Sequence, residues 1–132
     1  IEWQADTFRN RTGIKCRLVN DGYEPELTKD QATALFRIFQ ELLTNIIRHA
    51  EAKDVIVRLE KQDGELRLQV EDNGRGITED EIHSPHAFGL LGIRERLYPL
   101  GGQVVFKGRA GRGTRVTIHL PMEKIDQKGV TS

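Results

Sequence analysis

Two apolar runs joined by a turn constrain this chain more than any other feature. Residues 66–70 alternate apolar and polar side chains, residues 55–59 form a second strand-like run, and Asp63-Gly64 lies between them. Alternation with a period of two predicts a strand with one buried face, and Asp-Gly is a strong hairpin signal. A hairpin of this kind has one apolar face to bury, so another part of the chain must supply the layer that covers it.

Asp72 continues the alternation of the second run and is therefore expected on its apolar face. A carboxylate directed into a core is costly unless a donor reaches it. Gly74 and Gly76 follow closely, where the backbone can turn or be approached by a ligand. Segment 71–76 therefore predicts a pocket for a flat, apolar ligand that carries an N–H donor, and an adenine ring meets this description.

The remaining patterns predict an α+β fold. A helix is expected over residues 29–50, because its apolar residues recur at i, i+3, i+4 and i+7. These residues are Leu35, Ile38, Phe39, Leu42, Leu43, Ile46, Ile47 and Ala50. Further helices are expected over 1–11 and 89–100, and further strands over 14–19, 104–107 and 114–120. We therefore expect about three helices packed on one face of a mixed, mostly antiparallel sheet.

The composition indicates one soluble domain. The chain has 132 residues, with 20 Lys and Arg against 20 Asp and Glu, so its net charge gives no reason to expect a nucleic-acid or acidic membrane partner. Cys16 is the only cysteine, which excludes a disulfide framework within the chain and favours a reducing compartment. The chain starts at Ile1 without Met, so we expect a fragment of a longer protein, with one domain over residues 1–121 and a flexible tail over 122–132.

A polar stripe on the long helix is the second candidate for chemistry. Glu41, Asn45 and His49 are spaced at i, i+4 and i+8, which places them on one stripe beside the apolar face. Glu41 can accept a proton or orient a reacting group, and the amide oxygen of Asn45 suits a hard cation such as Mg²⁺. Arg48 can reach a phosphate. The same spacing is also typical of a solvated helix face.

Two weaker signals lie further along the chain. Gly89 to Gly92 lie at the start of a predicted helix, whose amide groups and dipole suit phosphates, although a simple helix-start turn has the same pattern. Thr114 is in phase with the apolar residues of the last strand, as many strand threonines are. His83, His86 and His119 are expected to be surface residues.

The charge is uneven near the end of the chain. No acid occurs between Glu95 and Glu123, whereas several bases do. These bases are Arg96, Lys107, Arg109, Arg112 and Arg115. A solvated strand face and a mild attraction for a polyphosphate or a partner are both consistent with this pattern.

Taken in order, four motifs resemble the ATP-binding catalytic domain of bacterial two-component sensor histidine kinases. Residues 40–50 (QELLTNIIRHA) are similar to that family's N box, 71–77 (EDNGRGI) and 88–96 (FGLLGIRER) to its two glycine boxes, and 113–121 (GTRVTIHLP) to its closing strand. The family has the Bergerat-type fold, a two-layer α/β sandwich shared with gyrase B and MutL. The short spacing between the glycine boxes resembles the subclass that pairs with LuxR-type response regulators.

The resemblance implies a role for each candidate residue. Asp72 would accept a hydrogen bond from the adenine amino group, Asn45 would hold Mg²⁺, and Glu41 would orient or activate the acceptor histidine. Residues 77–88 would form the lid over ATP. The other residues implied in ATP binding are Arg48, His49, Gly74, Gly76, Ile77, Gly89, Leu90, Leu91, Gly92 and Thr114.

The family's acceptor histidine lies on a separate dimerising helical hairpin, with an acidic residue directly after it. None of the four histidines here has that neighbour. The resemblance therefore implies that this chain binds ATP but does not phosphorylate itself, and that it is a monomer in isolation. Its implied partners are its own acceptor domain and a response regulator with a LuxR-type output domain, without nucleic acid or membrane contact. The implied location is cytoplasmic, and the parent kinase can be membrane-anchored.

Two other functions share parts of this pattern. A serine kinase of the anti-sigma type has the same N and glycine boxes. An ATP-gated conformational module, as in gyrase B or MutL, continues into a transducer domain with a lysine that reaches the γ-phosphate. The end of this chain soon after Pro121 favours the histidine kinase interpretation over the gated module.

Overall fold

The computed structural model describes residues 2–20, 23–50, 52–76, 78, 80, 89–109 and 112–122. The helices with described bounds are α1 (Glu2–Thr12), α2 (Lys29–Asn45) and α4 (Leu90–Leu97). A π-helical turn over Ile46–Ala50 extends α2, and a 3-10 turn over Tyr98–Leu100 extends α4. The strands are β1 (Lys15–Val19), β2 (Asp54–Gln62), β3 (Glu65–Asp72), β4 (Gln103–Arg109) and β5 (Gly113–Pro121).

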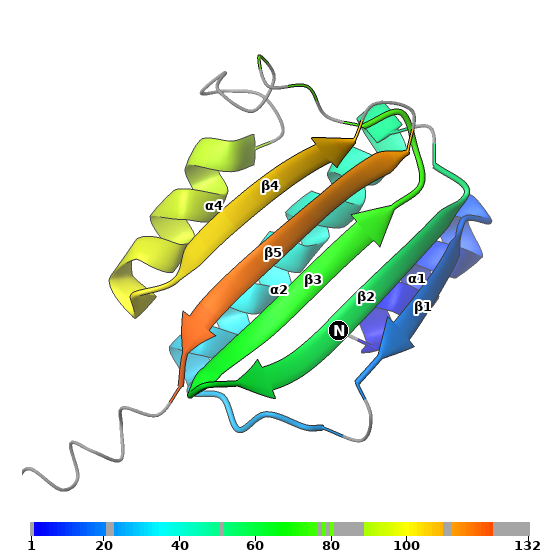
Figure 1. Cartoon of the computed structure of the whole chain (residues 1–132). Coiled ribbons are helices and arrows are strands. Elements are labelled where there is room, and N and C mark those ends of the chain that lie inside the picture. The colour runs from blue at the N-terminus through cyan, green and yellow to red at the C-terminus, as the bar shows by residue number, and fades with distance from the viewer. Residues whose placement is uncertain are drawn as a thin grey trace, which may run out of the picture.

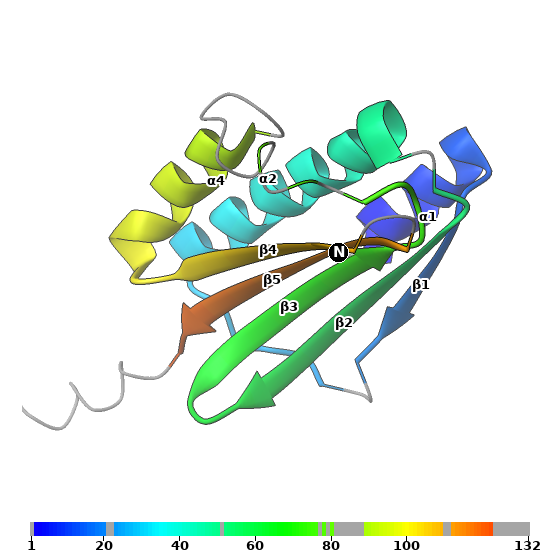
Figure 2. The same cartoon turned by 45° about the horizontal axis from the view of Figure 1, so that its top comes forward.

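The strands form one sheet in the order β1-β2-β3-β5-β4. β1 and β2 are parallel, and the other neighbours are antiparallel. Helices α1, α2 and α4 all lie on one side of this sheet, and no helix within the described residues covers its other face (Figures 1 and 2). The predicted α+β class, with about three helices on a mixed and mostly antiparallel sheet, is confirmed.

Helix α2 begins where the sequence predicts it. The Thr28 side chain accepts a hydrogen bond from the backbone N–H of Gln31 at 3.1 Å, and the Gln31 side chain accepts one from the backbone N–H of Thr28 at 2.9 Å. This reciprocal capping box satisfies two donors that would otherwise lack partners at the helix start. It therefore fixes the residue at which α2 begins.

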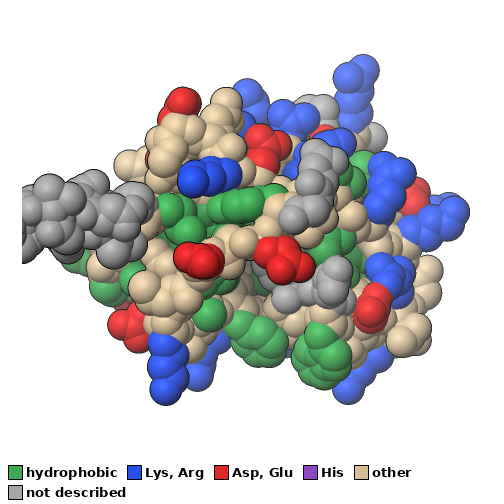
Figure 3. Space-filling view, turned by 90° about the horizontal axis from the view of Figure 1, so that it is seen from below, with side chains coloured by type: hydrophobic (Ala, Val, Ile, Leu, Met, Phe, Trp, Pro, Cys, Tyr) green, Lys and Arg blue, Asp and Glu red, His purple; other side chains and the backbone are tan. Residues whose placement is uncertain are grey.

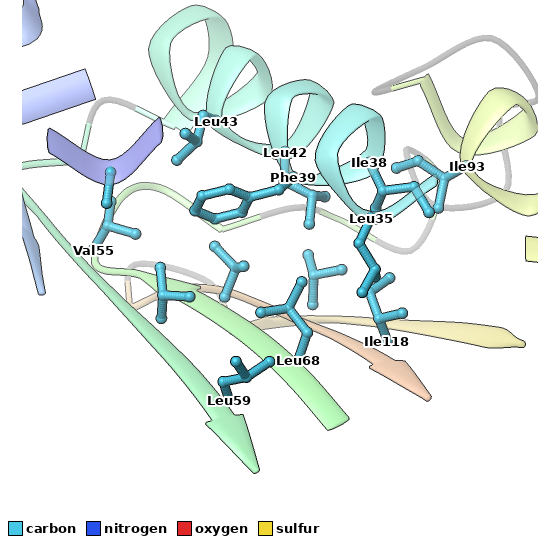
Figure 4. Close-up of a cluster of buried hydrophobic side chains, with 14 of the residues drawn as sticks. Leu35, Ile38, Phe39, Leu42, Leu43, Val55, Leu59, Leu68, Ile93 and Ile118 are labelled. Carbon is cyan, nitrogen blue, oxygen red and sulfur yellow. The ribbon is translucent and has the colours of Figure 1, made fainter. Parts of the chain in front are cut away.

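The apolar stripe of α2 forms the centre of the core. Figure 4 shows its side chains directed at residues of the central strands, with Ile93 of α4 beside them. Phe39, Ile38 and Leu68 are fully buried. Ile47 was predicted on this stripe but is 55% exposed, because the wider π turn that starts at Ile46 carries it away from the sheet.

Two turns follow their local sequence signals. Asp63 and Gly64 join β2 to β3 with φ values of 51° and 77°, the pair of positive angles that a two-residue hairpin turn requires. Pro99, which lacks a backbone N–H, lies in the 3-10 turn that follows α4. At the hairpin end of the molecule, hydrophobic side chains are visible between the two layers, with charged side chains around them (Figure 3).

Candidate functional site

The segments that carry the predicted motifs meet at one end of the sheet. Figures 1 and 2 agree that the end of β3, the start of β5, the C-terminal part of α2 and the start of α4 lie at the end opposite the β2–β3 hairpin turn. Sequence motifs more than 60 residues apart are therefore neighbours in space. The fold brings them together because β5 lies between β3 and β4 in the sheet. The antiparallel pairing of β3 and β5 places the start of β5 beside the end of β3.

Asp72 is a buried carboxylate at the end of β3. It is 7% exposed, on the face that also carries Leu68 and Val70, so its predicted direction is confirmed. The backbone N–H of Gly74 donates to its Oδ1 at 2.8 Å, and the backbone N–H of Thr114 also hydrogen-bonds the carboxylate. Burial raises the pKa of Asp72, and the hydrogen bonds from Gly74 and Thr114 act in the opposite direction. The carboxyl group is thus held in place by backbone donors in a setting that disfavours its charge.

Gly113 brings β5 against the peptide that carries Asp72. A methyl group at Gly113 would lie 1.8 Å from the Asp72 carbonyl oxygen and 2.9 Å from Cα of Asn73. Its φ of 111° is also a conformation that residues with side chains rarely adopt. Only glycine allows this approach, so Gly113 is a site residue that the sequence motif contained but that our sequence analysis did not single out.

Asn73 was also missed, although its side chain and backbone both bond to the start of β2. Its Oδ1 accepts hydrogen bonds from the backbone N–H groups of Lys53 at 2.9 Å and Asp54 at 3.0 Å. Its Nδ2 donates to Oδ2 of Asp54 at 3.0 Å, and its backbone N–H donates to the Asp54 carbonyl oxygen at 3.2 Å. The available signal was an asparagine in a turn, a residue type that commonly bonds nearby backbone groups.

Glu41 and Asn45 are half-buried on α2, at the edge of its apolar stripe. Glu41 contacts the start of α4: a methyl group at Gly89 would lie 2.6 Å from Oε2 and 2.7 Å from Cδ of Glu41. The Glu41 carboxylate therefore lies against the backbone of Gly89. This contact joins the predicted polar stripe to the predicted glycine pair.

The π turn bears on the predicted stripe of Glu41, Asn45 and His49. That prediction assumed α-helical periodicity through residue 49, whereas the π turn begins at Ile46 and has more residues per turn. Glu41 and Asn45 precede the turn and keep the predicted α-helical spacing. Arg48 is exposed, and the side chain of His49 lies outside the described residues.

The start of α4 has the features expected of an anion site. Gly89 is its N-cap, with φ of 63° and without a side-chain hydrogen bond to the first turn. Leu90 is buried, Leu91 is 47% exposed and Gly92 is half-buried. Because the N-cap residue Gly89 has no side chain, it does not itself cap the amide groups of this first turn, which suits them to a phosphate. Ile77 and residues 81–88, predicted as part of the lid, lie outside the described residues.

Other features of the described residues bear on the expectations from composition. Arg115, in the basic stretch, pairs with Glu71 at 3.2 Å across β5 and β3, on the sheet face opposite Asp72. His119 contacts Glu65 on the same face at 3.1 Å. These two contacts favour the solvated strand face over a polyphosphate site for this part of the stretch.

Two kinds of feature are absent from the described part of the chain. No group of three or more His, Cys, Asp or Glu side chains in it could hold a metal ion. None of its helices has the length and apolar character needed to span a membrane.

Comparison with known proteins agrees with this geometry. A family model described as histidine kinase-, DNA gyrase B-, and HSP90-like ATPase matches residues 30–124. The chain belongs to this family. The match contains the polar stripe of α2, Asp72 and its glycines, the start of α4 and all of β5. The four motifs therefore lie within one known ATPase fold, as the resemblance implied.

Several curated relatives are histidine kinases. The chain is 34% identical over 116 residues to the histidine-protein kinase/phosphatase DegS of Brevibacillus brevis, a match that covers 88% of this chain and 30% of DegS. It is 33% identical to the sensor histidine kinase LiaS of Bacillus subtilis (89% and 32%) and 35% identical to the nitrate/nitrite sensor protein NarX of Escherichia coli (71% and 16%). The chain thus spans a third or less of the length of these relatives.

Solved structures give the same result. The histidine kinase domain of a blue-light activated kinase from Erythrobacter litoralis aligns with a TM-score of 0.70 at 26% identity, covering 92% of this chain and 58% of that one. The histidine kinase AdeS of Acinetobacter baumannii aligns with a TM-score of 0.74 at 20% identity, covering 92% and 60%, which shows the shared fold.

Proposed function

We propose that this chain binds Mg²⁺-ATP and donates the γ-phosphoryl group to a histidine on a separate dimerisation and acceptor domain. The observation that carries this proposal is the buried Asp72 carboxylate beside the closely packed backbone of Gly113 and Gly74. A buried carboxylate can accept a hydrogen bond from a ligand whose flat, apolar body fills the space next to it. The adenine amino group offers such a donor.

The adenine end of the ligand would lie at the junction of β3 and β5. Asp72 would accept from the exocyclic amino group, while Gly74 and Gly76 would let the backbone pass under the ring. Thr114 would lie beside the base at the start of β5, where its backbone N–H already hydrogen-bonds the Asp72 carboxylate. Ile77, which follows the glycines in the sequence, is proposed as a further ATP-binding residue.

The triphosphate end would lie between α2 and α4. Asn45 would offer its amide oxygen to Mg²⁺, whose remaining ligands would be phosphate oxygens and water. The backbone amide groups of Gly89, Leu90, Leu91 and Gly92 would bind phosphate oxygens at the start of α4. Arg48 and His49 would add donors from the end of the long helix. The ion would neutralise the charge of the phosphates, and the residues of the chain would fix the position of the ion.

Glu41 would act on the acceptor rather than on ATP. Its carboxylate lies against Gly89, at the point where the phosphate-binding turn of α4 meets α2. From there it would orient an incoming histidine, or accept its proton, as the γ-phosphoryl group moves to the ring nitrogen. Phosphoryl transfer of this kind depends mainly on positioning and charge neutralisation.

The acceptor and the signalling partners would lie outside this chain. The named relatives are sensor kinases of which the chain covers a third or less, so we propose a parent kinase that supplies the helical acceptor hairpin. The spacing of the glycine boxes supports a response regulator with a LuxR-type output domain as the next partner. We also propose that the domain works in the cytoplasm, and that residues 1–121 form it and 122–132 a flexible tail.

Binding and transfer can be tested separately. Titration calorimetry with ATP and Mg²⁺ should show binding by the unaltered chain and at least a ten-fold loss for Asp72→Asn, because the amide presents a donor where an acceptor is needed. Transfer of γ-phosphate label to the parent's helical hairpin should be lost in Glu41→Gln, with ATP affinity nearly unchanged. Glu60→Gln, on the open face of the sheet, is the matched control.

Three results would contradict the proposal. Absence of ATP binding at millimolar nucleotide would exclude it altogether. Transfer of the label to a serine-containing protein instead of the hairpin would favour an anti-sigma-type kinase. Acid-labile label on this chain alone would contradict the expectation that it has no acceptor.

A further inference from the structure

The Asn73 side chain connects the end of β3 to the start of β2, directly beside Asp72. Its amide group makes the hydrogen bonds to Lys53 and Asp54 described above, over a sequence separation of 19 or 20 residues. Asn73 is exposed and on the opposite side of the backbone from Asp72, so these bonds do not belong to the apolar core. They act on the backbone itself.

The peptide that carries Asp72 is therefore held from both sides. On one side, Asn73 binds it to β2, where Asp72 is paired with Val55. On the other side, Gly113 of β5 lies against the Asp72 carbonyl group. Since Gly74 then turns back to donate to the Asp72 carboxylate, the direction of that carboxylate depends on where Asn73 fixes the chain.

We propose that Asn73 and Asp54 form a positioning pair for nucleotide binding, which sets the direction of Asp72 and the path of the glycine turn. This proposal rests on the proposed ATP site and names two residues that act on it without touching the ligand. A turn fixed in advance costs less entropy when a ligand binds, so the loss of the pair should lower affinity.

The polarity of the pair gives a specific test. Asn73→Ala removes three hydrogen bonds and should weaken ATP binding by roughly ten-fold. Asn73→Asp still accepts from both backbone N–H groups but faces the Asp54 carboxylate, so it should weaken binding as well. Asp54→Asn keeps an acceptor for the Asn73 amide and should bind nearly as the unaltered chain does. The double variant Asn73→Asp with Asp54→Asn reverses the pair and should recover the affinity.

A second measurement separates positioning from general stability. If Asn73 acts through Asp72, then adding Asn73→Ala to Asp72→Asn should cause little further loss of ATP affinity, since the group that it positions no longer reads the base. Dissociation constants should be measured by calorimetry at a temperature at which circular dichroism shows every variant folded. Asn10→Ala, at an exposed position on α1, is the control for loss of a surface asparagine.

The outcomes are distinct. Recovery by the double variant, together with non-additive losses at positions 72 and 73, supports the proposal. Affinity within two-fold of the unaltered chain for Asn73→Ala, no recovery in the double variant, or additive losses would each overturn it while leaving the ATP site in place. Absence of ATP binding by the unaltered chain would overturn both this proposal and the proposed function.

Discussion

Gly113→Ala should destabilise the fold far more than an ordinary glycine substitution. The new methyl group would lie 1.8 Å from the Asp72 carbonyl oxygen, whereas ordinary contact begins at 3.4 Å, so β5 and the end of β3 would have to separate by about 1.6 Å. The positive φ adds about 1–2 kcal/mol of backbone strain, and overpacking of this kind adds about 1–3 kcal/mol. The free energy of unfolding should therefore fall by about 2–5 kcal/mol, or about 6–20 °C in Tm.

Gly64→Ala is the matched control for this experiment. Gly64 also has a positive φ, of 77°, but no heavy atom lies within 4 Å of the position its methyl group would take. It should show the backbone strain alone, about 1–2 kcal/mol. Urea unfolding followed by circular dichroism would compare the two variants. Equal losses of stability would refute the close approach of β5 to Asp72 as the reason for glycine at position 113.

Three further variants test other parts of the structure. Because burial raises the native pKa of Asp72 above its ordinary value of 3.8, its stabilising contribution is present below that value and lost as pH rises through the native pKa. The free energy of unfolding of Asp72→Asn minus that of the unaltered chain should thus increase between pH 4 and pH 7; a decrease would mean that the hydrogen bonds outweigh burial. Thr28→Ala should lower the free energy of unfolding in urea by about 1 kcal/mol through loss of the capping box. Thr28→Ser should retain most of the stability of the unaltered chain. Leu68→Ala should cost about 2–5 kcal/mol, since Leu68 is fully buried, and a cost below 1 kcal/mol would contradict the packing of α2 on β3.

The features predictable from sequence were those set by residues close together in the chain. Alternation placed Asp72 on the buried face, the Asp63-Gly64 pair gave the hairpin, and helical spacing gave the buried stripe of α2. For the strand and the helix, the periodicity of one element was sufficient, because a strand or helix determines which side its own residues face. The motif resemblance then indicated which segments contribute to one site.

The features that were missed depend on how elements meet. The partners of Asn73 lie on another strand, and a one-residue change of register would remove them. The requirement for Gly113 comes from the backbone of Asp72 in β3, 41 residues earlier in the chain. The π turn at Ile46 has no clear signal in an amphipathic pattern that continues across it, and it changed the predicted position of Ile47.

The sheet order has a consequence for the folding of the site. Asp72 belongs to the hairpin of β2 and β3, whereas Gly113 and Thr114 belong to the hairpin of β4 and β5. Each hairpin pairs residues near in sequence, but β3 and β5 join partners as far apart as Glu65 and Pro121. Long-range pairing closes larger loops and forms more slowly than local hairpins. Neither hairpin alone contains the adenine end of the proposed site, so a refolding chain should gain affinity for nucleotide only when the two hairpins dock, and nucleotide in the solution should stabilise that last step.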